Sequence, residues 1–330
     1  MVDEAALKGI IAPECVKELQ APSGMGAAVA KGDIVGIRDA MGFDAKNITT
    51  HQLVITDEVI KGIPVRIYRK QELAGQTLPV MIYVHGGGFV GGYLHAPNVE
   101  QICRTFADHG DLQVISVGYR LAPEHPYPAG LTDCYQIVQE VAANPAKFNA
   151  QVTEMSIMGD SAGANVALAT AILDSSFYQT HFIKKILAYY PVVDLTTHGQ
   201  GEFWNPEHIY VKTPAERKLY DDYIAGFAQL ENIVENMYAG PTMDRATALL
   251  SPLYADQDIL KNLPPMHTIF GEFDPLRQQN EAFATRLAQL GNPETVSIYP
   301  GMIHAFMDKV GVYPEAEQAI DEGLQFLMKK

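Results

Sequence analysis

The chain has 330 residues, of which 47% are hydrophobic, and a formal net charge of −15 at pH 7. This length and composition allow a large buried core, either in one α/β domain with an insertion or in two domains. The acidic balance argues against a nucleic-acid-binding surface, since no basic cluster exceeds a pair such as Lys184 and Lys185. No apolar run reaches the length of a membrane span.

The chain start and the cysteines indicate the compartment in which the protein works. Asp3 and Glu4 stand where a secretory signal peptide would carry positive charge. Cys103 and Cys134 fall on the apolar faces of expected helices, which is typical of buried free thiols in a reducing compartment. We therefore expect a cytoplasmic protein without membrane contact.

The pattern of apolar residues changes along the chain. Helices are expected near residues 6–11 and 29–41, after which strand and helix patterns alternate, as in a mostly parallel, doubly wound α/β sheet. The first two strands should form an antiparallel edge that turns at Lys61 and Gly62, and the apolar third strand should lie centrally. Strands are expected at residues 52–56, 64–68, 78–84, 112–117, 155–158, 185–190, 266–270 and 295–299. Helices are expected at residues 98–109, 131–143, 165–173, 276–290 and 315–328.

The alternation is interrupted at residues 196–248, which lack strand patterns. Thr213, Pro214 and Glu216 form a capping box with proline at the first helical position, which predicts the start of a helix with one apolar face. Because this segment directly follows a strand, we expect it to stand over the carboxyl edge of the sheet, together with residues 1–46.

A serine turn lies between the strand expected at residues 155–158 and the helix after it. Gly159, Ser161 and Gly163 form the G-x-S-x-G pattern of a nucleophile elbow. The turn is tight enough that a Cβ atom at either glycine would collide with the neighbouring element. A glycine-rich turn with an incidental serine would have the same pattern, so the assignment depends on residues elsewhere.

The run of Gly86, Gly87 and Gly88 follows the third strand, at the edge where ligands bind in open parallel sheets. Consecutive glycines let backbone N–H groups approach a carbonyl oxygen that gains negative charge, as an oxyanion hole requires. A glycine-rich turn without such a purpose is the alternative. Gly86, Gly88 and Gly91 also fit a dinucleotide fingerprint, but the next strand ends without the acidic residue that such a site needs.

Loops after the last two strands carry an acid and a histidine. Asp274 and His304 follow Ser161 in the order serine, acid, histidine that α/β-hydrolase triads have. His304 would take the proton from Ser161, and Asp274 would hold the imidazole in the required tautomer. Asp194, which also follows a strand, is the competing candidate for the acid.

A metal centre has less support than this triad. Neither an H-E-x-x-H nor a C-x-x-C motif occurs, and the Glu-His pairs at residues 124–125 and 207–208 have no spaced second ligand. We therefore expect neither a metal nor another cofactor.

Together these motifs resemble the hormone-sensitive-lipase family, the bacterial type IV esterases of the α/β-hydrolase fold. The resemblance implies Ser161, Asp274 and His304 as the triad. It also implies a helical cap of residues 1–46 and 196–248 on a catalytic domain of residues 47–195 and 249–330. The matching blocks run in family order at residues 85–88, 119–129, 159–163, 274–277 and 301–304. The oxyanion hole would be formed by the N–H groups of Gly86, Gly87 and Ala162.

Single residues depart from the family's usual pattern at Gly118, Ala164, Gln278 and Ala305. The usual residues there are an aspartate, a glycine, an acid and a glycine, respectively. Since none of these positions supplies a triad atom, the departures concern fine tuning rather than the reaction.

The resemblance implies a serine carboxylesterase that acts on a small-molecule ester and needs no cofactor. An amidase or deacetylase on the same site is an alternative, and so is a non-catalytic receptor such as the plant gibberellin receptors, although the presence of His304 favours catalysis. Cap helices would wall the pocket, so we expect a preference for short acyl chains of about two to six carbons. The sequence leaves open whether the protein forms a homodimer.

Overall fold

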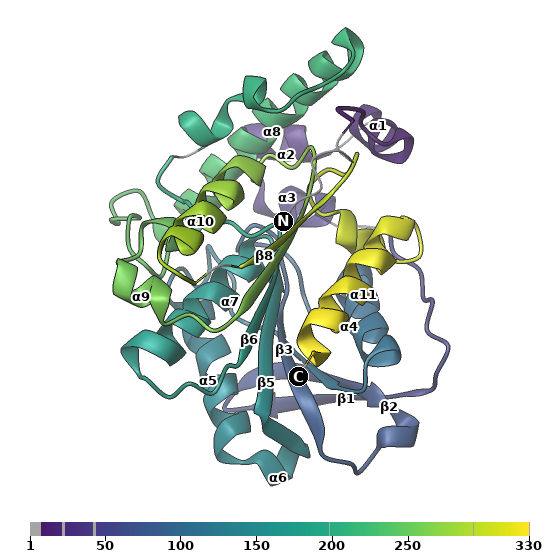
Figure 1. The fold of residues 1–330 in the computed structure, drawn as a ribbon. Helices are drawn as coiled ribbons and strands as arrows, with labels where there is room; N and C mark the ends of the chain where they lie inside the picture. The colour runs from purple at the N-terminus through teal and green to yellow at the C-terminus, as the bar shows by residue number, and fades with distance from the viewer. Residues whose placement is uncertain (1–7, 22–23, 42–43, 198, 293, 330) are drawn as a thin grey trace.

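The computed structural model describes residues 8–21, 24–41, 44–197, 199–292 and 294–329, and contains a single eight-stranded sheet with helices on both faces (Figure 1). The strand order is β1-β2-β4-β3-β5-β6-β7-β8. β2 pairs antiparallel with β1 and β4, and all other neighbours are parallel. The predicted α/β-hydrolase fold is thereby confirmed. The strands are β1 (Leu53–Ile60), β2 (Ile63–Lys70), β3 (Leu78–Val84), β4 (Gln113–Val117), β5 (Ala150–Asp160), β6 (Lys185–Tyr189), β7 (Met266–Gly271) and β8 (Thr295–Tyr299).

The helices form two layers around the sheet and a third group at one end of it. α4 and α11 cover one face, and α5, α7 and α10 cover the other (Figure 1). None of the helices in the described parts of the chain combines the length and apolar composition that crossing a bilayer needs. The helices are α1 (Pro13–Gln20), α2 (Met25–Lys31), α3 (Ile34–Ala40), α4 (Pro97–His109), α5 (Ala129–Ala143), α6 (Pro145–Phe148), α7 (Ala162–Ile172), α8 (Pro214–Ala239), α9 (Gln257–Lys261), α10 (Arg277–Gln289) and α11 (Pro314–Met328).

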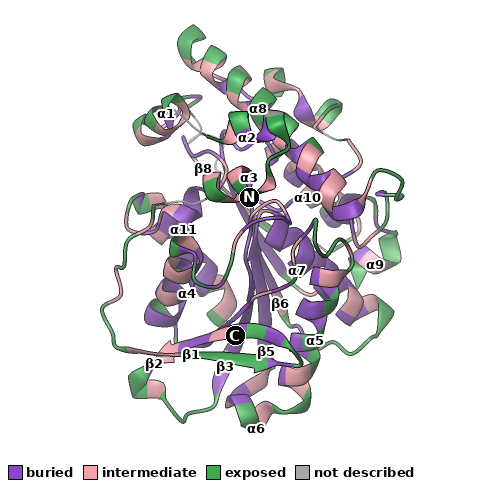
Figure 2. Cartoon of the chain, turned by 180° about the vertical axis from the view of Figure 1, so that it is seen from behind, coloured by how far each residue is buried: buried purple, intermediate pink, exposed green. Residues whose placement is uncertain are grey.

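The apolar sequence of β3 places it inside the sheet. It pairs with β4 on one side and β5 on the other, and it is buried almost throughout its length (Figure 2). The β1–β2 edge is a hairpin whose two turn residues, Lys61 and Gly62, have positive φ angles of 54° and 86°. Such a turn matches the twist of an antiparallel pair. Both predictions are confirmed, and this hairpin lies at the opposite end of the strand order from β8.

The helices α1, α2 and α3 lie with α8 beyond the ends of the parallel strands (Figure 1). α8 begins where the capping box predicts, because the Thr213 side chain accepts a hydrogen bond from the Glu216 N–H at 3.2 Å. Its 26 residues make it the longest helix of this group. The division of the chain into cap and catalytic domain stays a prediction.

Two expected N-terminal helices differ from the observed ones. Ile10 and Ile11 are not helical, residues 6–7 lie outside the described residues, and the first observed helix begins at Pro13. The helix expected at residues 29–41 is two helices. Gly32, at a φ angle of 62°, ends α2, and Asp33 then caps α3 by accepting a hydrogen bond from the Gly36 N–H at 3.1 Å. Left-handed backbone and a capping side chain together end one helix and start another.

The cysteines are buried and unpaired, as predicted for Cys103 and Cys134. Cys15, on α1, is also a free buried thiol. Burial raises the pKa of Cys15 to about 12 and holds that of Cys134 well above its usual range. These thiols therefore pack as small apolar groups.

Candidate active site

The turn from β5 into α7 holds Ser161 in a strained conformation. Its φ and ψ angles are 53° and −124°, a region that side-chain-bearing residues rarely adopt. A Cβ atom at Gly159 would lie 2.5 Å from the carbonyl oxygen of Gly163, and one at Gly163 would lie 2.2 Å from that of Val84. Both glycines are thus required by the close approach of backbone, which is the steric reason expected for a nucleophile elbow.

The side chains of Ser161, His304 and Asp274 form a continuous hydrogen-bonded chain. Ser161 Oγ lies 2.8 Å from His304 Nε2, and His304 Nδ1 lies 3.0 and 3.1 Å from the two carboxylate oxygens of Asp274. With the imidazole proton on Nδ1, that nitrogen donates to the carboxylate and Nε2 accepts from the serine hydroxyl. This arrangement lets the imidazole remove the serine proton while the buried carboxylate fixes its orientation.

Aromatic residues fix the position of the His304 ring. The ring centroids of Tyr190 and Phe227 lie 4.7 and 4.8 Å from that of the imidazole. The His304 backbone N–H donates to the Tyr223 hydroxyl at 3.3 Å. Tyr223 and Phe227 both belong to α8, so the helix above the site contacts the histidine directly.

Asp194 has different partners. One carboxylate oxygen accepts hydrogen bonds from the N–H and hydroxyl groups of Thr196 at 2.7 and 2.6 Å, and the other accepts from the Tyr254 hydroxyl at 3.3 Å. These bonds hold the loop after β6. The carboxylate that contacts His304 is that of Asp274, so the geometry favours Asp274 over Asp194 for the acid.

The glycine loop differs in one respect from the sequence prediction. The Gly86 N–H donates to Asp160 Oδ1 at 3.0 Å, so it is already engaged inside the protein. Within the described residues, the N–H groups of Gly87, Gly88 and Ala162 donate no hydrogen bond. This bond favours Gly88 over Gly86 as a donor beside Gly87 and Ala162, while the role predicted for Gly86 stays a prediction. Sequence reasoning missed Gly88 because the choice depends on Asp160, which is distant in the chain.

Asp160 connects the glycine loop to the elbow. Its Oδ1 also accepts from the Tyr83 hydroxyl at 2.7 Å, and burial raises its pKa to about 6. Gly87 and Gly88 have φ angles of 119° and 58°, which glycine adopts without strain.

Helical residues cover the glycine loop. A Cβ atom at Gly88 would lie 3.3 Å from the Met41 Cε and Val234 Cγ2 atoms, which belong to the segment after α3 and to α8. Tyr238, one turn further along α8, stacks on Phe89 with ring centroids 4.0 Å apart. The space beside the free amides is therefore bounded by apolar side chains from both helical segments.

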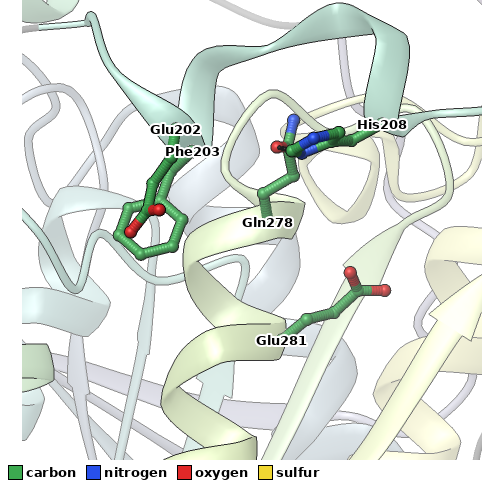
Figure 3. Close-up of a pocket in the computed structure, with 5 residues that line it drawn as sticks. All are labelled: Glu202, Phe203, His208, Gln278 and Glu281. Atoms are coloured by element: carbon green, nitrogen blue, oxygen red, sulfur yellow. Dashed lines mark hydrogen bonds between the residues drawn. The ribbon is translucent and has the colours of Figure 1, made fainter.

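A separate cavity of about 340 Å³ lies next to α10 (Figure 3). It contains none of the triad or glycine-loop residues. Gln278 uses its side chain here, contacting the His208 ring at 2.7 Å and donating to the Asn205 carbonyl at 2.8 Å. Gln278, one of the departures from the family pattern, thus holds the segment that contains Asn205 and His208. The cavity is lined by Glu202, Phe203, His208, Gln278 and Glu281.

Local backbone geometry explains two of the three other departures from the family pattern. Ala305 takes a left-handed φ angle of 62°, the conformation for which glycine is favoured. A Cβ atom at Gly118 would lie 3.1 Å from the Pro64 carbonyl oxygen, so little room exists for a side chain. Nothing in the structure explains Ala164.

Among the described residues, no three His, Cys, Asp or Glu side chains are grouped as a metal site requires.

Comparisons with known proteins agree with this geometry. The model of the family described as the α/β-hydrolase fold matches residues 81–308. Carboxylesterase NlhH of Mycobacterium tuberculosis is 31% identical over 269 residues, which are 81% of this chain and 78% of the relative. The acetyl esterase of Salmonella typhi is 26% identical over 291 residues, covering 87% and 82% of the two chains.

Solved structures give the same result over nearly the whole length. A Pyrobaculum calidifontis esterase superimposes with a TM-score of 0.72 and 29% identity, over 96% of this chain and 98% of that one. A Rhizomucor miehei esterase gives a TM-score of 0.77 and 25% identity, over 97% and 96%. The chain thus belongs to the α/β-hydrolase family, and its resemblance to the hormone-sensitive-lipase esterases is confirmed.

Proposed function

We propose that this protein is a serine carboxylesterase that cleaves esters of short acyl chains through an acyl-enzyme. The observation that carries the proposal is the unbroken contact from Ser161 Oγ through His304 to Asp274, beside backbone amides that donate no hydrogen bond within the described residues. The names of the relatives, among them a carboxylesterase, an arylesterase and an acetyl esterase, support ester hydrolysis.

The reaction follows from the roles of these groups. Ser161 Oγ attacks the ester carbonyl carbon as His304 Nε2 takes its proton. The N–H groups of Gly87, Gly88 and Ala162 hold the resulting oxyanion, and the N-terminal end of α7 adds its positive dipole. The imidazolium then protonates the departing alcohol. Water, activated by the same histidine, hydrolyses the acyl-enzyme and restores the free serine.

The helices that cover the site support a short acyl group. Met41 and Val234 lie against Gly88, and Phe227 lies against His304, so apolar side chains close the site from above. Each methylene that fits adds up to about 0.8 kcal/mol of binding, and this gain ends where the wall begins. We propose acyl chains of about two to six carbons, with the cap and the catalytic domain divided as the sequence predicts. A cytoplasmic location and a small-molecule ester as partner complete the proposal.

The test is a set of p-nitrophenyl esters of increasing acyl length, measured beside matched anilides. We expect hydrolysis of the short esters and far slower cleavage of the anilides. Ser161→Ala should lower kcat by about 10⁴ or more while the protein stays folded. Ser176→Ala, near the far end of the same helical segment, is the matched control and should retain normal activity.

Specific outcomes would favour the alternatives. Faster cleavage of the anilides would indicate an amidase. Absence of turnover with tight ligand binding would indicate a receptor. A Ser161→Ala protein that keeps a tenth of the wild-type activity would exclude Ser161 as nucleophile.

A further inference from the structure

Helix α8 crosses the site from the histidine to the glycine loop. Phe227 contacts the His304 ring, and Val234, about two turns later, lies against Gly88. Residues three and four positions apart share one face of a helix. Glu231 lies four residues after Phe227 and three before Val234, so it is on the face that covers the site, between the base and the oxyanion donors. A substrate attached to Ser161 would pass beneath this position.

The carboxyl group of Glu231 is buried without a full set of partners. The residue is 4% exposed, and its Oε2 atom has no hydrogen-bond partner among the described residues. Glu235, one turn later, has Arg245 at 3.2 Å. Leaving a buried carboxyl oxygen without a donor costs free energy, and the cost is larger when the group is charged. Burial also raises the pKa of Glu231 to about 7, whereas His304 acts in the opposite direction.

The surroundings favour a positively charged partner. Asp274 acts on Glu231 electrostatically, and Asp160 lies next to the nucleophile, so carboxyl groups border the site on several sides. A neutral donor could bond to Oε2 but would leave the charge of the Glu231 carboxylate uncompensated, and an anionic group would be repelled. A protonated amine supplies both an N–H donor and a compensating charge. Phe227 and Val234, which lie on this face of α8 toward the base and the glycine loop, are apolar and would contact the alkyl substituents of the amine.

We propose that Glu231 is a specificity-determining residue that accepts a hydrogen bond from a protonated amine of the substrate ester. This inference rests on the proposed esterase function and specifies its substrate class. The carboxylate and the ammonium group form a charge-assisted pair inside the closed site, while the ester carbonyl occupies the space between Ser161 and the free amides.

The experiment compares esters with their uncharged carbon isosteres. The first pair places the amine in the alcohol part of the ester. 2-(Dimethylamino)ethyl acetate, which is protonated at neutral pH, is compared with 3-methylbutyl acetate. The second pair places the amine in the acyl part. Ethyl 3-(dimethylamino)propanoate is compared with ethyl 4-methylpentanoate. For at least one pair, wild-type kcat/KM should be about ten- to a hundredfold higher for the amine, the range for a hydrogen bond to a charged group.

Substitution of Glu231 identifies the group responsible. In Glu231→Gln, which keeps the shape and loses the charge, the amine-to-isostere ratio should fall at least tenfold. The ratio cancels any change in catalysis that both esters share. Asp222→Asn removes the same charge from an exposed position of α8, where Asp222 pairs with Lys218, and should leave the ratio within about threefold.

Each result decides the proposal. Equal wild-type rates on both members of both pairs would overturn it, even if Glu231→Gln does not fold. A loss in Glu231→Gln that is the same for amine and isostere would overturn it too, because Glu231 would then act on catalysis. If neither the isosteres nor the p-nitrophenyl esters are hydrolysed, the esterase function itself is wrong.

Discussion

The sheet edge that carries Ser161 and the helix that covers it are built differently. At the edge, Ser161 Oγ, both ring nitrogens of His304 and both oxygens of Asp274 are engaged with one another. On the covering face of α8, Phe227 and Val234 are aromatic or apolar, and the carboxyl of Glu231 keeps an oxygen that has no partner among the described residues. The catalytic groups at the edge are therefore preorganised, while α8 offers a hydrogen-bond acceptor that a substrate could use.

The two regions are joined at the loops that carry the triad. The buried carboxylate of Glu272 accepts from the Gly9 N–H at 2.9 Å and from the Gly301 N–H at 2.8 Å. The Ala12 N–H donates to the Gly301 carbonyl at 3.0 Å. Glu272 precedes Asp274 by two residues, and Gly301 precedes His304 by three. The N-terminal segment is thus tied to both loops, which carry the acid and the base.

The largest effect should come from breaking the edge itself. Asp274→Asn should lower kcat by about 10⁴, because a neutral amide can stabilise the wrong imidazole tautomer. Asp194→Asn is the matched control, since that carboxylate bonds to Thr196 and Tyr254, and it should stay within about tenfold of wild type. Steady-state kinetics on a short p-nitrophenyl ester would measure both. Equal losses, or the reverse ranking, would transfer the role to Asp194.

The serine turn at this edge could be predicted from the sequence because its glycines are required by local geometry. Gly159 and Gly163 are required by contacts within and beside one turn, and a strand followed by such a turn is visible in the chain. The oxyanion donors could be predicted only in part. The choice between Gly86 and Gly88 depends on the Asp160 carboxylate, which reaches the loop across 74 positions of sequence.

The cap could be predicted as helical, but not in its details. The break at Gly32 and Asp33 separates two helices inside one apolar pattern. Glu231 has the sequence appearance of a solvated charge on a helix that also carries exposed acids such as Asp222. Only the packing of α8 over the sheet edge buries it, and no local pattern encodes that packing.

A smaller effect should come from removing the N-terminal part of the cap. Deletion of residues 1–40 should lower kcat/KM on the preferred short ester by about a hundredfold, because misplacing the triad loops by about 1 Å has that cost. Glu272→Gln, which weakens the same connection without removing helices, should change activity in the same direction by less. Circular dichroism would verify that both proteins fold. Full activity of the deletion, or a preference for long-chain triglycerides, would show that the cap does not shape the site.

The smallest effect is on the pH dependence of the unfolding free energy, to which the buried Glu231 of α8 should contribute. Burial raises the pKa of Glu231 from 4.5 to about 7, so the folded protein favours the protonated carboxyl. Between these values the folded state binds more protons than the unfolded state, and stability falls as pH rises. At about 1.36 kcal/mol for each pH unit, the loss between pH 5 and pH 8 is on the order of 2 kcal/mol. Glu231→Gln lacks this titration, so its unfolding free energy relative to wild type should rise over the same interval in urea denaturation. The exposed Asp222→Asn should show no such rise, and a Glu231→Gln difference that is constant with pH would contradict the burial of an unpaired acid in the cap.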